Sequence, residues 1–200
     1  MSPPPTRFAR PLKGALPAAW QSQFRGSRAV NQKDRSSSMG HHVLQRRIET
    51  PLGPLTAARS AAGLSGLWFD GQKHHPGPLG VPEDDGSDAV LSATAAALTA
   101  YFSGGPFELP PLDPAGTAFQ REVWRALLDI PPGAPDTYGH LAERLGRASA
   151  ARALGAAVGR NPISVLVPCH RVVGADGSLT GYAGGLDRKK ALLNLEGAGA

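Results

Sequence analysis

Residues 161–174 read Asn-Pro-Ile-Ser-Val-Leu-Val-Pro-Cys-His-Arg-Val-Val-Gly, and they hold the one cysteine of the 200-residue chain, Cys169. The apolar run 163–167 predicts a short strand that ends at the next proline. His170 and Arg171 follow the cysteine at once. Cationic and imidazole groups lower the pKa of a thiol, and the thiolate is its reactive form. The stretch therefore predicts a reactive cysteine, with a buried inert cysteine as the alternative.

His170 needs a particular geometry to serve this cysteine as a base. Adjacent residues on a strand point to opposite faces, so the strand must end near Pro168 or a water must connect Cys169 to His170. A histidine base also needs a carboxylate that orients its ring. Glu196, at the end of the helical stretch 191–195, is an available partner.

Before this stretch, the chain has the pattern of two short helices joined by a tight turn. The first helix is expected near 138–145, Gly146 opens the turn, and a second helix over about 149–158 carries Arg152. Helix, glycine turn and helix form the helix-turn-helix pattern, although paired helices also occur as ordinary packing. Between 137 and 171 there are five arginines and one acid. This excess favours a polyanionic partner, with a solvated helix face as the alternative.

Farther upstream the patterns change from helix to strand. Apolar residues recur at three- and four-residue intervals over 119–128 and 90–102, which predicts two amphipathic helices. Residues 42–70 alternate extended apolar segments with proline and glycine turns, which predicts a β-meander or hairpin layer. The expected fold class is therefore α+β.

Composition excludes several classes of protein. One cysteine forms neither an intramolecular disulfide nor a cysteine-ligated zinc or iron–sulfur site. No stretch approaches the ~20 apolar residues of a membrane span, and no secretory signal is evident. We therefore expect a soluble intracellular protein without a membrane partner.

Charge is distributed unevenly along the chain. Residues 1–50 carry nine basic and two acidic side chains, whereas 51–118 carry two and seven. Proline, serine and arginine dominate 1–40, and predict a disordered or non-native N-terminal extension. Met39 is an alternative start of the chain, and an arginine-rich transit peptide is a rival interpretation.

Three motifs together resemble a known family. They are Asn161-Pro162-Ile163, the Pro-Cys-His-Arg-Val-Val of residues 168–173, and the Gly-Tyr-Ala-Gly-Gly-Leu of residues 181–186. They are similar to motifs of the O6-alkylguanine-DNA alkyltransferases, also called methylated-DNA–protein-cysteine methyltransferases. Supporting motifs at 119–124, 130–133 and 137–142 follow in the family's order. The resemblance covers about 42–197 and is most specific over 117–197.

The resemblance implies a two-domain fold. The N-terminal domain, 41–112, would be a small α/β unit of ribonuclease H-like type. The C-terminal domain, 113–200, would be helical, with a helix-turn-helix of winged-helix type and the active-site cysteine. Residues 1–40 have no counterpart in the family.

The implied function is DNA repair by direct reversal. The alkyl group of O6-alkylguanine, and as a further candidate of O4-alkylthymine, would pass to Cys169 and inactivate the protein after one reaction. The partner would be double-stranded DNA bound through its minor groove by a monomer. No cofactor and no metal are expected. The location would be the cytoplasm of a bacterium, or the nucleus of a eukaryote.

The resemblance also assigns roles to single residues. In catalysis, Cys169 is the nucleophile and acceptor, His170 a base acting through water, Glu196 the group that orients it, Asn161 the holder of the active-site turn, and Tyr138 the support of the departing guanine. DNA contacts are assigned to Arg152, which fills the gap left by the flipped nucleotide, and to Ala151, Gly155 and Arg160. The substrate pocket is assigned to Val172, Tyr182, Ala183 and Gly184. Flipping is required because the O6 substituent cannot reach a protein thiol inside the stack.

Two departures from the family concern the pocket. Ala183 stands where some relatives have serine, and Ser164 where some have proline, which leaves the range of alkyl groups open.

Three rival functions remain: a lesion sensor that lacks the acceptor thiol, a sequence-specific helix-turn-helix regulator, and a cysteine hydrolase. Cys169 argues against the sensor, and adjacent cysteine and histidine argue against the hydrolase.

Overall fold

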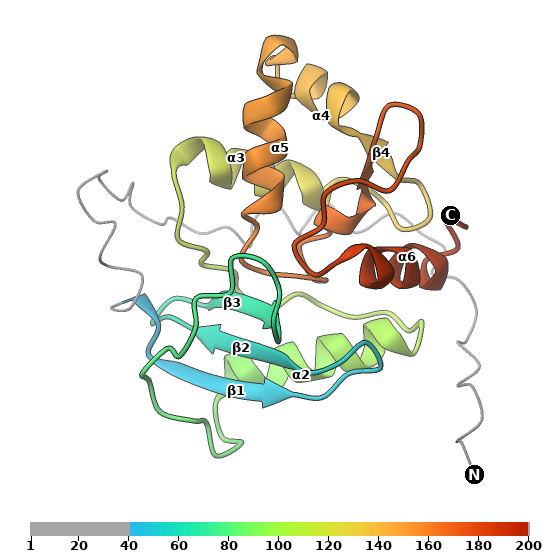
Figure 1. Ribbon diagram of the computed structural model, residues 1–200. Coiled ribbons are helices and arrows are strands. Elements are labelled where there is room, and N and C mark those ends of the chain that lie inside the picture. The colour runs from blue at the N-terminus through green and yellow to red at the C-terminus, as the bar shows by residue number, and fades with distance from the viewer. Residues whose placement is uncertain (1–40, 200) are drawn as a thin grey trace.

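A small antiparallel sheet and a group of helices make up residues 41–199, the part of the chain that the computed structural model describes (Figure 1). The extension predicted at 1–40 lies outside the described residues. In chain order the elements are β1 (Leu44–Ile48), β2 (Leu55–Arg59), β3 (Leu64–Phe69), α2 (Ala89–Phe102), α3 (Ala118–Leu128), β4 (Asp136–Thr137), α4 (Tyr138–Arg144), a 3₁₀ turn (Ala148–Ala150), α5 (Ala151–Gly159), a second 3₁₀ turn (Cys169–Arg171), β5 (Val172–Val173) and α6 (Leu186–Leu195). The α+β class is confirmed.

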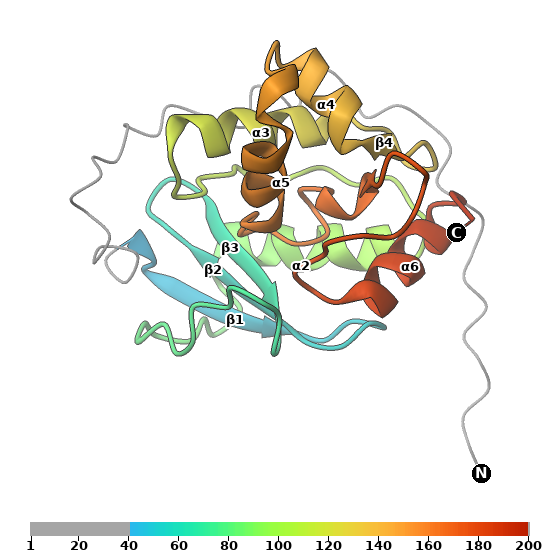
Figure 2. The same ribbon diagram turned by 45° about the horizontal axis from the view of Figure 1, so that its top comes forward.

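The predicted β-meander is present as a three-stranded sheet in the order β1-β2-β3. Both pairings are antiparallel, with Leu44 opposite Arg59 and Leu55 opposite Phe69. Every residue of β3 is buried, so this strand is covered on both faces. Helix α2 packs on all three strands, and the loops after α5 and before α6 approach β3 (Figure 2).

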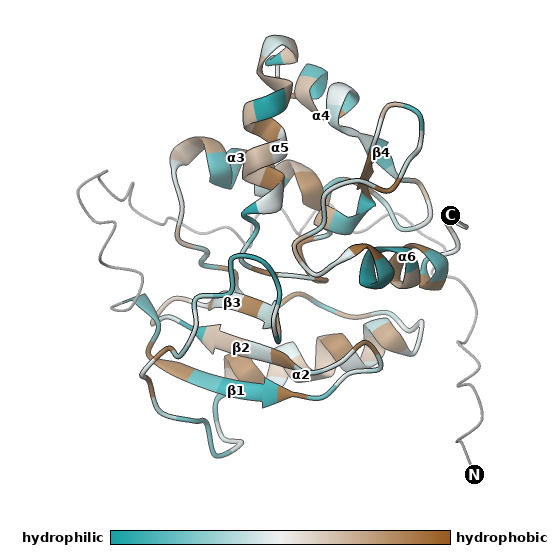
Figure 3. Ribbon diagram, in the orientation of Figure 1, coloured by the Kyte–Doolittle hydropathy of each residue, from teal (hydrophilic) through white to brown (hydrophobic). Residues whose placement is uncertain are grey.

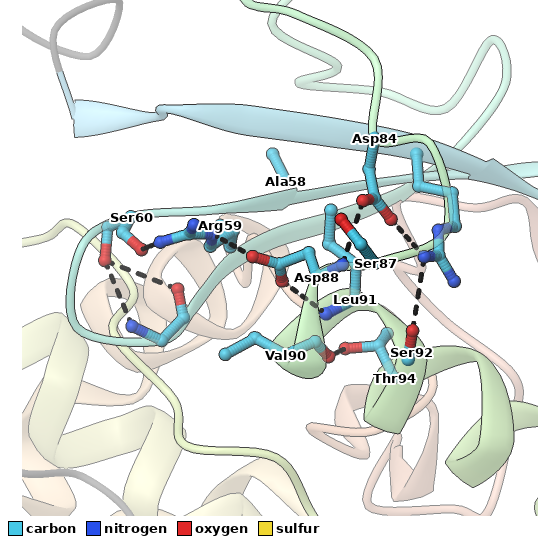
Figure 4. Close-up of polar contacts among 12 residues, drawn as sticks. Ala58, Arg59, Ser60, Asp84, Ser87, Asp88, Val90, Leu91, Ser92 and Thr94 are labelled. Carbon is cyan, nitrogen blue, oxygen red and sulfur yellow. Dashed lines mark hydrogen bonds and ion pairs between the residues drawn. The ribbon is translucent and has the colours of Figure 1, made fainter.

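Two ion pairs fix the start of α2 to the sheet (Figure 4). Asp88 caps the helix by accepting the Leu91 N–H at 3.0 Å, and Arg59 of β2 pairs with Asp88 at 2.7 Å. Arg46 of β1 pairs with Asp84, just before the helix. A carboxylate at a helix N-terminus satisfies a free backbone N–H and complements the helix dipole. The far end of α2 lies close to α6 (Figure 1).

The helices of the second half form the predicted helix-turn-helix. Helix α5 packs on both α3 and α4, and the Trp124 indole N–H of α3 donates to the Ala157 carbonyl of α5 at 2.9 Å. Gly146 ends the turn after α4 with a left-handed φ of 65°, a conformation that glycine adopts without strain. The predicted second helix begins as a 3₁₀ turn and becomes α-helical at Ala151.

The apolar run before the cysteine does not form the strand that the sequence predicts. The backbone turns instead: the Val167 N–H donates to the Ile163 carbonyl at 3.1 Å, and Val165 has a left-handed φ of 68°. Within residues 41–199, one isolated parallel bridge, Leu67 to Ile163, joins the run to the sheet. The Asn161 amide causes the turn, because it binds carbonyls that a strand would offer to a neighbour.

One continuous hydrophobic cluster joins the two halves of the described chain. It includes Leu67 and Phe69 of β3, Tyr101 of α2, Trp124 of α3 and the cysteine itself. Figure 3 shows hydrophilic and hydrophobic residues interleaved along α5 and α6, as expected for helices with one buried side. None of the helices in residues 41–199 is long and apolar enough to cross a membrane.

Candidate active site

Cys169 lies at the start of a 3₁₀ turn and is 4% exposed. The preceding turn, at 163–167, is held by Asn161, whose Nδ2 lies 3.0 Å from the Ile163 carbonyl, 2.8 Å from the Val167 carbonyl and 3.1 Å from the Cys169 Sγ. The Asn161 Oδ1 accepts the Ile163 N–H at 3.0 Å. One buried amide therefore shapes the turn and also donates to the sulfur.

The pKa of the thiol moves in the direction opposite to the prediction. Burial raises the pKa of Cys169 to about 11, and this outweighs the Asn161 hydrogen bond and the Lys189 charge, which both lower it. The sequence placed Arg171 beside the sulfur, but its guanidinium binds Glu196. Cys169 is consequently a neutral thiol at neutral pH, and its chemistry requires a base.

His170 and Glu196 are brought together in the core. The His170 Nε2 lies 2.9 Å from the Glu196 Oε1, and both side chains are fully buried. Arg171 donates to both carboxylate oxygens, from Nε to Oε2 at 2.9 Å and from Nη2 to Oε1 at 2.8 Å. The Tyr101 hydroxyl donates to Oε1 at 2.7 Å. Four donor groups therefore converge on one buried carboxylate.

This network fixes the proton on the histidine ring. Burial raises the pKa of Glu196, but the charges and hydrogen bonds of His170 and Arg171 lower it by a larger amount. The pKa of the carboxyl therefore lies well below its ordinary value. An ionised carboxylate only accepts, so Nε2 of His170 carries the proton and Nδ1 keeps a lone pair. Burial lowers the pKa of His170, which is therefore neutral. Its Nδ1 is buried and has no partner within residues 41–199.

Lys189 of α6 lies under the active-site loops. Its ammonium donates to the Val172 carbonyl at 2.5 Å and to the Thr180 carbonyl at 2.6 Å. Burial lowers the pKa of this lysine to about 8, and the nearby Cys169 opposes that shift. Lys189 therefore joins β5 to the loop before α6, and its positive charge lowers the pKa of the Cys169 thiol.

Of the predicted pocket residues, Val172 and Tyr182 lie close to the cysteine. The Val172 N–H donates to the Cys169 carbonyl, and Val172 is fully buried. Tyr182 packs with its ring 6.3 Å from that of His170, and burial followed by the nearby thiol raises its pKa. Within residues 41–199, the Ala183 N–H has no hydrogen bond, while its carbonyl accepts the Lys73 N–H at 2.9 Å.

Gly184 and Tyr138 both contact the loop before α6. A Cβ on Gly184 would lie 2.6 Å from the Tyr182 ring, closer than real side chains approach, so glycine is required there. The half-buried Tyr138 donates to the Gly181 carbonyl at 3.2 Å. Burial and then the Cys169 charge raise its pKa, so its hydroxyl keeps its proton.

The exposed side of α5 presents the predicted DNA-contacting residues. Ala151, Arg152 and Arg160 are exposed, and Gly155 is half-buried, where an added Cβ would make an ordinary 3.8 Å contact with the Tyr138 ring. Arg152 and Arg160 form no side-chain hydrogen bond or carboxylate ion pair within residues 41–199. The other three arginines of 137–171 do pair, as Arg144–Asp136 at 2.9 Å, Arg147–Glu122 at 3.1 Å and Arg171–Glu196 at 2.8 Å.

Sequence reasoning missed three members of this site. Tyr101 and Lys189 received no role, and Arg171 was expected to act on the thiol. The sequence gives no sign that the lysine at position 189 is buried. Tyr101 lies 95 residues before Glu196, so no local motif connects the two. Within residues 41–199, no three metal-binding side chains gather into a group that could hold an ion.

Fold and site together define a class: a helix-turn-helix protein with a buried cysteine beside a histidine–glutamate pair. A family model described as "6-O-methylguanine DNA methyltransferase, DNA binding domain" matches residues 118–198. A methylated-DNA–protein-cysteine methyltransferase of Mycobacterium bovis is 47% identical over 152 residues, which cover 76% of this chain and 90% of the relative. A protein of the same name from Methanosarcina acetivorans is 44% identical over 156 residues, covering 76% and 96%.

A solved structure agrees with these sequence matches. The crystal structure of Mycobacterium tuberculosis OGT in complex with DNA has a TM-score of 0.70 and 45% identity, covering 78% of this chain and 94% of that one. This chain therefore belongs to the methylated-DNA–protein-cysteine methyltransferase family.

Proposed function

We propose that this protein repairs DNA by moving the alkyl group of O6-alkylguanine onto the sulfur of Cys169. The observation that carries the proposal is the buried Cys169 in a chain of this family. Its sulfur accepts a hydrogen bond from the Asn161 amide, and the next residue, His170, is hydrogen-bonded to Glu196. The product is a thioether, which has no easy route of hydrolysis. Each molecule therefore acts once, without a diffusible cofactor.

The proposed chemistry is a displacement at the alkyl carbon. The thiol proton passes through a water to Nδ1 of His170, the S–C bond forms, and the C–O6 bond breaks with its electron pair moving to guanine. A neutral thiol needs this base because its pKa is about 11. Glu196 holds the histidine in the required tautomer and stabilises the imidazolium that forms.

Tyr138 supports the leaving group in this scheme. Guanine leaves more readily when its ring is hydrogen-bonded or protonated as the bond breaks. The Tyr138 hydroxyl keeps its proton and would donate it to the N3 edge of the base in place of the Gly181 carbonyl. The carbonyls of Cys169 and Val172 accept from the exocyclic amine, and each already accepts one hydrogen bond and keeps a second lone pair. The Ala183 N–H is a free donor on the loop formed with Tyr182 and Gly184.

We further propose that α5 enters the minor groove of double-stranded DNA. Ala151 and Gly155 are small enough for close approach of the helix to the backbone, and Arg160 supplies charge at its end. Arg152 fills the space of the flipped nucleotide, because its guanidinium is exposed and not held by a carboxylate. The protein would act as a monomer.

The finer description of the fold belongs to the same proposal. The sheet β1-β2-β3 with α2 would be a ribonuclease H-like unit spanning 41–112, and 113–200 would be a second domain of winged-helix type, in which the β4–β5 pair flanks the helix pair. Activity on O4-alkylthymine and a cytoplasmic or nuclear location stay predictions.

Intact mass spectrometry tests the proposed function. The protein is mixed with a duplex that contains O6-methylguanine, then digested and mapped, with Cys169→Ala as the control. We expect one added methyl on Cys169, saturating at one per protein, and none in the control. Tight lesion binding without added mass would favour the sensor, and preference for one unmodified sequence would favour a regulator.

A further inference from the structure

We infer that Tyr101 is a positioning residue of the alkyl transfer: its hydroxyl, supplied by α2, fixes the Glu196 oxygen that orients His170. The inference rests on the proposed function and adds to it a residue of α2, a helix that precedes the helix-turn-helix in the chain. Neither the sequence motifs nor the roles assigned above include Tyr101.

The geometry around Tyr101 is tightly defined. Its hydroxyl donates to the Glu196 Oε1 at 2.7 Å and lies 3.4 Å from the His170 Nε2. The side chain is 1% exposed. Edge-to-face contacts with Phe102 at 5.3 Å and Phe107 at 6.0 Å hold the ring. A rotamer fixed in this way presents the hydroxyl to one oxygen of one carboxylate.

The two oxygens of Glu196 accept different numbers of hydrogen bonds. Oε2 accepts from the Arg171 Nε, whereas Oε1 accepts from Tyr101, His170 and the Arg171 Nη2. The tyrosine and the histidine therefore share one acceptor. A donor on a carboxylate oxygen withdraws negative charge from it, so the Tyr101 hydroxyl moderates the attraction between Glu196 and the histidine.

Tyr101 stays a donor over the working pH range. Burial and the Glu196 charge raise its pKa well above the ordinary value. Removing the hydroxyl would leave Oε1 more negative toward His170 and would stabilise the imidazolium. The base would then titrate at higher pH. The other groups that act on His170 stay in place, and they are Glu196, Arg171, Lys189, Tyr182 and Cys169.

The test is the pH dependence of benzyl transfer from free O6-benzylguanine to Cys169 in Tyr101→Phe. Phenylalanine keeps the ring and removes only the hydroxyl. We expect the acid limb of the rate profile to move up by about 0.5 to 1 pH unit. The rate then falls about 3- to 10-fold on that limb and approaches the parent rate at higher pH, since each pH unit corresponds to a factor of about ten.

Thr94→Val is the matched control. Thr94 is fully buried in the same helix, and its hydroxyl donates to the Val90 carbonyl at 2.8 Å, away from Glu196. The control loses a buried hydroxyl of α2 and is expected to keep the parent pH profile. A uniform loss of rate in Tyr101→Phe, or the same change in both variants, would reduce Tyr101 to a structural residue and overturn the inference.

NMR of protein with ¹⁵N-labelled histidine gives a second readout that needs no alkyl transfer. We expect the Nε2–H signal of His170 to move downfield in Tyr101→Phe, with the Nε2–H tautomer kept, because its bond to Oε1 strengthens. An unchanged signal would overturn the inference. If the parent protein transfers no alkyl group, the proposed function fails, and this signal still decides whether Tyr101 acts on His170.

Discussion

Replacing Glu196 by glutamine should cost a large part of the stability of the protein. The carboxylate has four donors around it and no acceptor. With the glutamine oxygen at the Oε1 position, the NH₂ group faces the Arg171 Nε, and donor then opposes donor. The reverse orientation sets the NH₂ against three donors. In either case the buried Arg171 loses its counter-charge, although it keeps a 2.5 Å bond to the Ile130 carbonyl.

Leaving one partner of a buried ion pair uncompensated costs about 3–5 kcal/mol. Urea unfolding followed by tryptophan fluorescence measures this loss. With a slope of about 2 kcal/mol/M, the midpoint of Glu196→Gln should fall by roughly 1.5–2.5 M. The control is Glu122→Gln, the same chemical change in the exposed Arg147–Glu122 pair. It should cost about 0–1 kcal/mol.

The pH dependence of the difference follows from the pKa of Glu196. That pKa is lower in the folded state than in the unfolded chain. The contribution is therefore complete above the unfolded value of about 4.3 and is lost as the pH falls through the lower folded value. A loss below about 1 kcal/mol at pH 7, or a gap between parent and variant that widens in acid, would refute the reasoning.

Three further predictions concern the thiol, Gly184 and α5. Because the pKa of Cys169 is about 11, alkylation by iodoacetamide, followed by mass, should speed up about tenfold per pH unit from pH 7 to 10; a plateau near pH 8 would contradict this. Gly184→Ala should lower stability by about 1–3 kcal/mol in thermal unfolding through overlap with Tyr182, whereas Gly155→Ala, in a helix with room for a Cβ, should be neutral or stabilising. Arg152→Ala should slow transfer from duplex DNA about tenfold or more and leave transfer from free O6-benzylguanine unchanged; equal losses would argue against gap filling.

Local patterns were sufficient for most of the secondary structure. Apolar periodicity located α2 and α3, and the turn at Gly146 located the helix pair. These features depend on residues within a few positions of one another. The sequence therefore contains the information in a form that pattern analysis can use.

The errors arose where a distant or hidden group decides the outcome. The run at 163–167 has strand composition, but the Asn161 side chain captures its carbonyls and turns it. The direction of the Cys169 pKa shift was mispredicted because the residues adjacent in sequence do not show how deeply the thiol is buried. Tyr101 and Lys189 join the site only through tertiary contacts.

The protonated state of the Cys169 thiol affects how long an unreacted molecule stays active. In the unfolded chain a cysteine ionises near pH 8.5, whereas burial holds Cys169 neutral until about pH 11. Folding thus shields the sulfur from small electrophiles in its surroundings. A protein that acts once and cannot be regenerated would otherwise age by random reactions. In this arrangement the same burial that makes a base necessary also preserves the supply of working molecules between lesions.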